Sequence, residues 1–580
     1  MFNRPLFLSV RDDGTATRLI SILNTLYLAE LFGDRALGKF FWNDQFVPYV
    51  YGETLDRRSD FRIFNKQRII GQSVEAKERI FSQSFIDKYY MNNIYNYSTN
   101  DMFIDKFIYQ DDVFDINWNM SLELLKDKYK SKKYKYFYVH HNDLSEQLKG
   151  IIDKDYRAKI SEIWKSIDFT DCINNIMNYA WLQIKNVFDK DFTVLHIRSG
   201  DVIYDFANFR KFNTQGIYHA TPCELAIGII EENKYENIVL IGDDLDSIQL
   251  IANKFNQKNI ISIEDLRESK KLTNLELLFF DLAVMSRANK IFGTHSALVR
   301  LALLINPNIS FFNNYSIFNF KQQYKIITFY FNKMSFSNCQ KAFSLFHQFI
   351  LGKRIGEKFD ILYKYLNEAL LFDPDNDKYR IHILDLFISM QQIEQAELYL
   401  DEILSTRKKE FLNTLFLKGW EGIVYQEVFY NYLKSCNINY PNLSYVASKI
   451  LYFKVGAANR VKNQLAYRLG RIMVLNSKNF FDLIKTPIKL LHEVFLYKKE
   501  QKEYKIKIMK NPELKLPPLS EYLDYNEVDN IKRHLSYRLG NALIEANKNW
   551  YKGGYIIAVF RIMIISIKYS SSKIKKRFVK

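Results

Sequence analysis

Two patterns of apolar residues alternate along the first half of the chain. Short apolar runs indicate strands, and longer segments with apolar residues every three or four positions indicate helices. The strands are predicted at 5–10, 40–44, 136–143, 192–198, 237–242, 259–263 and 290–293, and the helices at 16–33, 155–190, 221–233, 246–256, 273–287 and 296–305. Strands that alternate with helices of this length are typical of parallel sheets. We therefore predict an α/β fold with two Rossmann-like domains, at 1–165 and 166–345.

Strand patterns fade beyond about residue 345, and the rest of the chain is predicted to be helical. Residues 369–404 are similar to a tetratricopeptide-type (TPR-like) helical hairpin, in which Asp373-Pro374 ends the first helix. A single unit of this kind cannot bury its faces alone, so we expect residues 346–425 to pack on neighbouring parts of the chain. A peptide-binding role is the alternative to plain packing.

The predicted C-terminal domain, residues 426–580, contains a duplicated segment. Residues 462–481 resemble residues 532–551, and both copies carry the sequence Tyr-Arg-Leu-Gly. An apolar, basic stretch follows each copy, and the second one includes Lys573, Lys575, Lys576 and Arg577. Such a stretch suits an anionic membrane interface. Two helices of an ordinary bundle with a basic tail are the alternative.

Composition and charge exclude several classes of protein. The 580 residues are 48% hydrophobic and 25% charged, which excludes a disordered polyelectrolyte. The 4 cysteines form no CxxC pair, which argues against a zinc ribbon, a redox pair or a disulfide framework. The 82 basic and 65 acidic residues give a net charge of +17. We assign this charge to an anionic membrane and not to nucleic acid, because the sequence carries no nucleic-acid-binding motif.

Neither a secretory signal nor a membrane span is predicted. The N-terminus has a short apolar run followed by acidic residues, and no stretch of 18 uncharged apolar residues occurs. We therefore expect a cytoplasmic protein, with peripheral binding to the inner face of the cytoplasmic membrane as a further expectation for the basic C-terminus.

The most informative motif is FTVLHIRSGD at 192–201. It places His196 and Arg198 at the carboxyl end of a predicted parallel strand, where ligands bind in α/β folds. Arg198 offers a fixed cation with forked donors, which suits a diphosphate that gains negative charge as its glycosidic bond breaks. A structural arginine paired with Asp201 is the alternative.

Two further predicted strands end in polar residues. One ends in Asp243 and Asp244, whose carboxylates suit guanine edges or ribose hydroxyls, or the start of a helix. The other ends, ahead of a predicted helix, in Gly293, Thr294, His295 and Ser296. Amides and hydroxyls at that helix start would form a phosphate cradle, with a simple N-cap role for Ser296 as the alternative. Three polar strand ends in one α/β unit predict a shared ligand site.

This order of motifs resembles the donor half of the GT-B fucosyltransferase group. The matching elements are HxRxGD, a strand that ends in two aspartates, and GTHSALVRLALLI at 293–305. The group includes α1,2- and α1,6-fucosyltransferases, nodulation fucosyltransferases and protein O-fucosyltransferases. The resemblance covers residues 1–340 and is specific in the donor half, and the region after residue 340 also looks similar to tails of bacterial surface-glycan glycosyltransferases.

The N-terminal domain of that group often opens with a turn of the form G-x-G-N-[QR]-[LA]. In this sequence Gly14, Arg18 and Leu19 match, whereas Ala16 and Thr17 replace the second glycine and the asparagine. The resemblance implies that Gly14 and Arg18 face the donor cleft from the acceptor side.

The strand end at 140–143 would face the same cleft. Adjacent His140 and His141 suggest a metal site, but neighbouring strand residues point to opposite faces, so one buried and one surface histidine is the preferred interpretation.

The resemblance also implies roles for the donor residues. Arg198 would contact the β-phosphate of GDP-fucose and stabilise departing GDP, and His196 would help to seat the nucleotide. Either Asp243 or Asp244 would bind guanosine, and the 294–296 segment would contact the phosphates. Enzymes of the group invert the anomeric centre and need no metal or other cofactor.

The acceptor hydroxyl must lose a proton near the donor, which makes Asp201 and Asp205 candidate general bases.

We therefore expect an inverting, metal-independent glycosyltransferase that moves a sugar to a glycan or lipid-linked glycan acceptor in bacterial surface polysaccharide synthesis. GDP-fucose is the expected donor. Another nucleotide sugar is the alternative within the class, and a non-catalytic helical-repeat adaptor is the alternative outside it. The acceptor and the linkage follow no readable code in the sequence.

Overall fold

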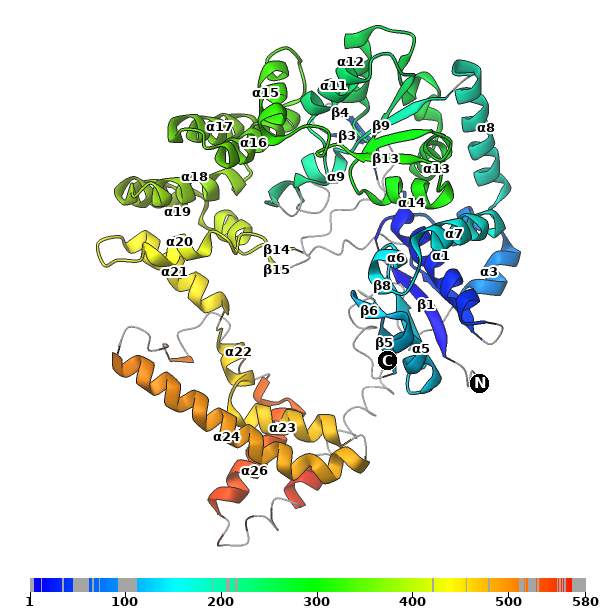
Figure 1. The fold of residues 1–580 in the computed structure, drawn as a ribbon. Helices are drawn as coiled ribbons and strands as arrows, with labels where there is room; N and C mark the ends of the chain where they lie inside the picture. Colours follow the sequence, from blue (N-terminus) through cyan, green and yellow to red (C-terminus); the bar gives the residue numbers. More distant parts are fainter. Residues whose placement is uncertain are drawn as a thin grey trace. The chain divides into compact units, whose positions relative to one another are not determined.

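The computed structural model divides the chain into two compact units, Met1–Val428 and Phe429–Lys580 (Figure 1). It describes residues 5–11, 13–33, 36–44, 62–64, 67–71, 73–91, 112–189, 191–204, 209–213, 217–419, 422–454, 456–477, 480–510, 516, 518–519, 528, 531–549, 551, 554, 557 and 560–565. The first unit holds a four-stranded and a five-stranded parallel sheet, so the predicted α/β class is confirmed. The finer division into four domains stays a prediction.

The first sheet has the strand order β2-β1-β7-β5, and all of its pairs are parallel. Its strands are β1 (Leu6–Arg11), β2 (Leu37–Trp42), β5 (Val113–Asp115) and β7 (Tyr136–Val139). Buried Phe7 and Phe137 lie side by side on one face, where their ring centroids are 5.5 Å apart. Helix α1 (Thr15–Leu31) covers this face with an apolar stripe that includes Leu19 and Leu23.

The second sheet has the order β11-β10-β9-β12-β13, again with every pair parallel. Its strands are β9 (Thr193–Ile197), β10 (Ile238–Gly242), β11 (Ile260–Ser262), β12 (Lys290–Gly293) and β13 (Ser310–Asn313). The intervening helices are α11 (Cys223–Glu232), α12 (Leu245–Phe255), α13 (Asn274–Met285) and α14 (Ala297–Ile305). This topology puts β9 in the centre, so the loop that follows β9 opens between the ends of β10 and β12.

The predicted helical bridge at 155–190 consists of two helices, α7 (Asp153–Ser166) and α8 (Asp171–Val187). Thr170 ends the continuity, because its side chain caps α8 by accepting a hydrogen bond from the Ile173 amide at 3.4 Å.

Short elements complete the sheet-bearing part of the first unit. They are β3 (Arg62–Phe64), β4 (Gln67–Ile69), α2 (Lys77–Ile80), α3 (Gln83–Tyr89), β6 (Met120–Ser121), α5 (Leu122–Lys130), α6 (Leu144–Gln147), β8 (Leu148–Lys149), α9 (Gly200–Ile203) and 3₁₀ turns at Phe209–Lys211, Ile263–Asp265 and Ser269–Lys271.

A helical region follows the second sheet within the same unit. It comprises α15 (Phe320–Phe331), α16 (Asn338–Ile355), α17 (Phe359–Phe372), α18 (Lys378–Ser389), α19 (Ile393–Leu415), β14 (Lys418–Gly419) and β15 (Gly422–Ile423). The predicted hairpin at 369–404 falls in α17 to α19, with the chain turning at 373–377 and 390–392. The expected packing on neighbouring parts of the chain is present, because Asn376, in the turn between α17 and α18, donates to the Arg210 carbonyl oxygen at 3.1 Å. Identity with a TPR unit stays a prediction.

The second unit is helical in its described part. Its helices are α20 (Phe429–Lys434), α21 (Pro441–Lys454), α22 (Ala457–Lys462), α23 (Leu465–Asn476), α24 (Phe480–Lys510) and α26 (Leu535–Lys548). None of the helices in the described residues is both long and apolar enough to cross a membrane.

The duplicated segment forms a close helix pair in the second unit. A Cβ atom added to Gly470 of α23 would lie 1.6 Å from the Ser536 carbonyl oxygen, and one added to Gly540 of α26 would lie 1.7 Å from the Ala466 carbonyl oxygen. The matched glycines of the two copies therefore let each helix touch the backbone of the other.

Candidate functional site

The three polar strand ends predicted from the sequence lie next to one another. Arg198 follows the central strand β9, Asp243 follows β10 on one side, and Thr294 follows β12 on the other side. All three are at carboxyl ends of parallel strands, which is where α/β sheets bind ligands. The main chain at Arg198 is fixed, since its carbonyl oxygen accepts a hydrogen bond from the Thr221 amide at 3.1 Å.

Glycines allow these strand ends to approach closely. A Cβ atom at Gly200 would lie 2.3 Å from Oδ2 of Asp243, and one at Gly242 would lie 2.2 Å from the Ile197 carbonyl oxygen. The glycine of HxRxGD is therefore needed for the contact between the β9 loop and the β10 end, which the motif alone does not reveal.

The two aspartates after β10 have different environments. Asp244 is buried and caps α12, and it accepts hydrogen bonds from Ser247 Oγ at 2.7 Å, Tyr204 OH at 2.6 Å and Gln340 Nε2 at 2.9 Å. These bonds fill the acceptor capacity of its Oδ2 oxygen and favour the helix-start interpretation. Asp243 is partly exposed and accepts a hydrogen bond from the Ser199 amide at 2.7 Å. Of the pair, Asp243 is therefore the better placed for a ligand.

A segment from the N-terminal part of the chain covers this strand end. The Ile70 amide donates to the Asp243 carbonyl oxygen at 2.8 Å, and the Arg68 amide donates to Oδ2 of Asp246 at 2.8 Å. The side chain of Arg68 also forms an ion pair with Asp246. The β3–β4 hairpin is thus connected to the end of β10 and the start of α12.

The β12 end has the structure expected of a helix start. Ser296 caps α14 by accepting a hydrogen bond from the Val299 amide at 3.3 Å, and its neighbour His295 is exposed. The hydroxyl of Thr294 donates to the His219 carbonyl oxygen at 2.9 Å and is buried. The N-cap alternative for Ser296 is therefore confirmed, while phosphate binding at this helix start stays a prediction.

His196 is a buried neutral imidazole within β9. Burial, and then the nearby positive charge of Arg198, lower its pKa to about 3. Its Nδ1 atom has no hydrogen-bond partner among the described residues. Such a side chain is suited to fixing the shape of the site and not to carrying a charge at neutral pH.

Asp201 and Asp205 are the two candidate general bases. Asp201 lies in the short helix α9, and Asp205 lies outside the described residues. Their roles stay predictions.

The helical region holds the chain that continues from α9. Asn376 and Lys378 donate to the Arg210 carbonyl oxygen at 3.1 and 2.8 Å, and the Arg210 side chain pairs with Asp373 at 3.2 Å. Further along, Asn213 lies between two helical-region side chains: it donates to Glu427 and contacts Nε2 of His382. The turn that ends α17, predicted from Asp373-Pro374, therefore supports the loop after Arg198.

The first sheet ends in a polar cluster of its own. Arg11 at the end of β1 forms an ion pair with Asp13 and donates to Tyr138 OH at 3.1 Å. Desolvation alone would raise the pKa of Asp13, but the adjacent Arg11 guanidinium outweighs it and holds the pKa well below its usual range. The result is an internally neutralised pair with little exposed surface.

Arg18 is buried close to that pair. Its guanidinium donates to the carbonyl oxygens of Asp13 and Asn43 and lies 4.8 Å from the ring centroid of Trp42. Gly14 precedes α1 and accepts a hydrogen bond from the Arg18 amide at 3.2 Å. These contacts are those of a structural arginine, and nucleotide binding by Gly14 and Arg18 stays a prediction.

The two adjacent histidines follow β7, which ends at Val139, so the predicted alternation of strand side chains does not reach them, and both are half-buried instead of one buried and one exposed. Nε2 of His140 contacts Oδ1 of Asp115 at 2.6 Å, and the charges of Arg11, Asp13 and Arg300 influence the pKa of His141. Burial and the Arg11 charge lower the pKa of His141 well below its ordinary value. Among the described residues, no group of three or more His, Cys, Asp and Glu is arranged to bind a metal.

Sequence reasoning missed the residue that links this cluster to the second sheet. Arg300, one turn into α14, donates to the His141 carbonyl oxygen at 3.0 Å. The sequence feature that could have revealed Arg300 is a single charged residue in an otherwise apolar helix.

A family described as a domain of unknown function, DUF8374, matches residues 389–578. No curated protein matches the chain.

Two solved structures show a distant likeness. One is the NodZ α-1,6-fucosyltransferase soaked with GDP-fucose, with a TM-score of 0.29 and 12% identity over 52% of this chain and 93% of that chain. The other is POFUT1 in complex with GDP-fucose, with a TM-score of 0.27 and 12% identity over 53% of this chain and 99% of that chain.

Proposed function

We propose that the chain is a glycosyltransferase that binds a nucleotide diphosphate sugar at the carboxyl ends of β9, β10 and β12. One observation carries the proposal: Arg198 follows the central strand, with Asp243 beside it on one side and the α14 helix start on the other. A cation, a carboxylate and a helix start in this arrangement can bind, in order, a diphosphate, a nucleoside and a phosphate.

The reaction follows from these groups. An acceptor hydroxyl oxygen attacks the anomeric carbon, the bond from that carbon to the diphosphate oxygen breaks, and the electron pair leaves with the diphosphate. Arg198 stabilises the growing charge more strongly than the ground state, which is the condition for catalysis. The proton of the acceptor passes to a carboxylate, for which Asp201 and Asp205 are the candidates.

The finer assignment is transfer of L-fucose from GDP-fucose with inversion and without a metal. Asp243 would bind the guanosine and His196 would fix the pocket wall. We propose that the chain acts in bacterial surface polysaccharide synthesis at the inner face of the cytoplasmic membrane. Its acceptor would be a glycan or a lipid-linked glycan, and its basic C-terminus would make peripheral contact with the membrane.

The test is calorimetric titration of the full chain with GDP, UDP and CMP. We expect tighter binding of GDP, and loss of that binding in Arg198→Ala, with the exposed arginine variant Arg471→Ala as the matched control. Preference for UDP would support the glycosyltransferase proposal but overturn the assignment of GDP-fucose as the donor. Indifference to all three nucleotides would overturn the proposal and favour the adaptor alternative.

A further inference from the structure

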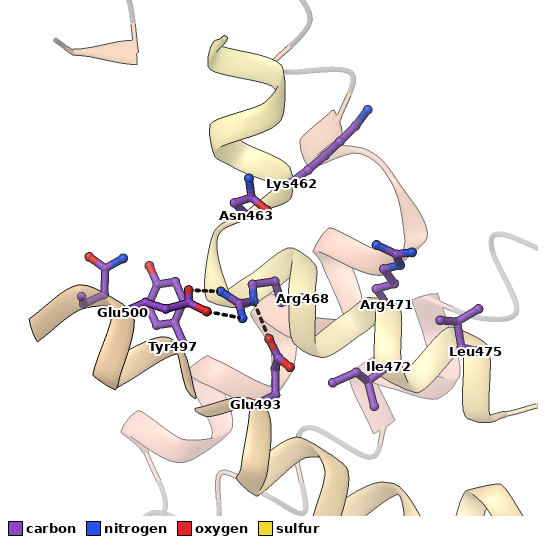
Figure 2. A pocket seen from close by; sticks show the side chains of 10 residues that line it. Lys462, Asn463, Arg468, Arg471, Ile472, Leu475, Glu493, Tyr497 and Glu500 are labelled. Carbon is purple, nitrogen blue, oxygen red and sulfur yellow. Dashed lines mark hydrogen bonds and ion pairs between the residues drawn. The ribbon is translucent and has the colours of Figure 1, made fainter. Parts of the chain in front are cut away.

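Helix α24 has one face fixed to its neighbour. Arg468 of α23 forms ion pairs with Glu493 and Glu500 of α24 and lies 5.5 Å from the ring centroid of Tyr497 (Figure 2). These residues line a hollow of about 700 Å³. Glu493, Tyr497 and Glu500 recur at helical spacing, so they define the side of α24 that faces α23.

The opposite side of α24 is apolar and exposed. Ile488, Leu491 and Phe495 share this side and are 72%, 72% and 67% exposed. Met509, two turns beyond the facing residues, continues the stripe and is 82% exposed. A run of large apolar side chains at this exposure marks an interaction surface.

Lysines lie along the same stripe. Lys498, Lys499 and Lys502 are exposed and follow Phe495 at helical spacing. At the positions that continue the stripe the sequence has no acidic residue, while Glu493 and Glu500 point inward to Arg468. The outer side of α24 is therefore both apolar and cationic.

We propose that this outer side of α24 binds the surface of an anionic lipid bilayer. An amphipathic helix with Leu and Phe on the inserted side and lysines beside them is suited to lie in the interface, where the lysine stems extend and their ammonium groups reach the headgroups. A second copy of the chain is the poorer partner, because pairing two such faces would bring like charges together.

The second copy of the duplicated segment has a related surface. Its α26 is followed by helical residues 560–565, in which Phe560, Met563 and Ile564 are exposed. Two exposed apolar segments after two matched helices give two membrane contacts per chain, and two contacts bind far more stably than one.

The experiment is co-sedimentation of the full chain with vesicles of phosphatidylcholine, with and without phosphatidylglycerol. Two variants test the surface: Leu491→Ser with Phe495→Ser, and Lys498→Glu with Lys502→Glu. The matched control is Leu398→Ser, which changes a leucine on α19 that is 73% exposed. Thermal unfolding of each variant checks that the fold is retained.

We expect binding to the mixed vesicles, weakened about tenfold or more in each α24 variant and unchanged in the control. Binding that ignores phosphatidylglycerol, or that survives both α24 variants, would overturn the proposal. The proposal would also be overturned if the wild-type chain formed a dimer and the Leu491→Ser, Phe495→Ser variant did not, because a second copy would then occupy this face of α24. This inference deepens the membrane setting of the proposed function, and GDP titration of the same variants reports the donor site separately, so failure of lipid binding can be told from failure of nucleotide binding.

Discussion

The two parallel sheets end in polar clusters of different character. At the first sheet, Arg11 and Asp13 neutralise one another and Arg18 donates to main-chain carbonyls. At the second sheet, Gly200 and Gly242 let the ends of β9 and β10 approach closely, and Arg198, Asp243 and the start of α14 follow neighbouring strands. We propose that the first cluster stabilises the fold and that the second binds a ligand.

This difference shows that a polar strand end is not by itself a binding site. Removing one partner of a buried ion pair leaves an uncompensated charge in the protein interior and so destabilises the fold. Charges at a junction of several strand ends and a helix start can bind an anion instead. The two clusters should therefore respond to mutation in different measurements.

The largest expected effect is on stability at the first cluster. Asp13→Asn leaves the buried Arg11 guanidinium without its counter-charge, and we expect a loss of about 3 kcal/mol in the free energy of unfolding. Urea unfolding measures it, and GDP affinity should not change. A fall in GDP affinity with unchanged stability would show that the first cluster, too, is a ligand site.

Arg198→Ala should give the opposite result. We expect turnover of the donor sugar to fall by about 100-fold or more, equivalent to ~3 kcal/mol of transition-state stabilisation, because the leaving diphosphate loses its cation. Release of GDP from GDP-fucose measures the turnover. The free energy of unfolding should change by less than about 1 kcal/mol. Arg198→Lys keeps the charge but loses the forked donors, so its turnover should lie between those of the wild type and Arg198→Ala. Full turnover in Arg198→Ala would remove the assigned role.

The pH dependence of stability should report buried histidines near the second sheet. His196 and His347 both have pKa values lowered to about 3 by burial, with Arg198 and Arg354 adding to the effect. Below the unfolded-state pKa of about 6.5 the unfolded chain binds protons that the folded chain does not, so stability falls as the pH drops.

Each such histidine contributes a slope of about 1.4 kcal/mol per pH unit between roughly pH 6 and 3. Urea unfolding across this range should therefore show a shallower slope in His347→Gln than in the wild type. An unchanged slope would mean that this ring titrates alike in the folded and unfolded chains.

The smallest expected effect concerns the helical region. Asn376→Ala removes the hydrogen bond to the Arg210 carbonyl oxygen, and we expect a loss of about 1 kcal/mol of stability and a modest fall in GDP affinity. Gln249→Ala, at an exposed helix position, is the control. Unchanged GDP affinity would show that the helical region supports the fold without supporting the site.

Much of the second sheet could be predicted from sequence because its information is local. The apolar runs predicted four of its five strands and missed β13, and β9, β10 and β12 are followed by the polar residues that the sequence identifies as candidates. Contacts between distant segments could not be predicted in this way. Two examples depend on tertiary packing. Asp244 accepts hydrogen bonds from Tyr204 and Gln340, and Arg300 donates to the His141 carbonyl oxygen. The burial of Arg18, whose motif position suggested a ligand, depends on tertiary packing as well.

The central claim is that the ends of β9, β10 and β12 form one nucleotide site. The measurement that tests it most directly is amide hydrogen exchange of the full chain, followed by mass spectrometry, with and without GDP. Protection at 196–204, 242–246 and 293–299 together is the predicted result. Protection confined to the first sheet, or no protection at these three segments under conditions where GDP is bound, would contradict it.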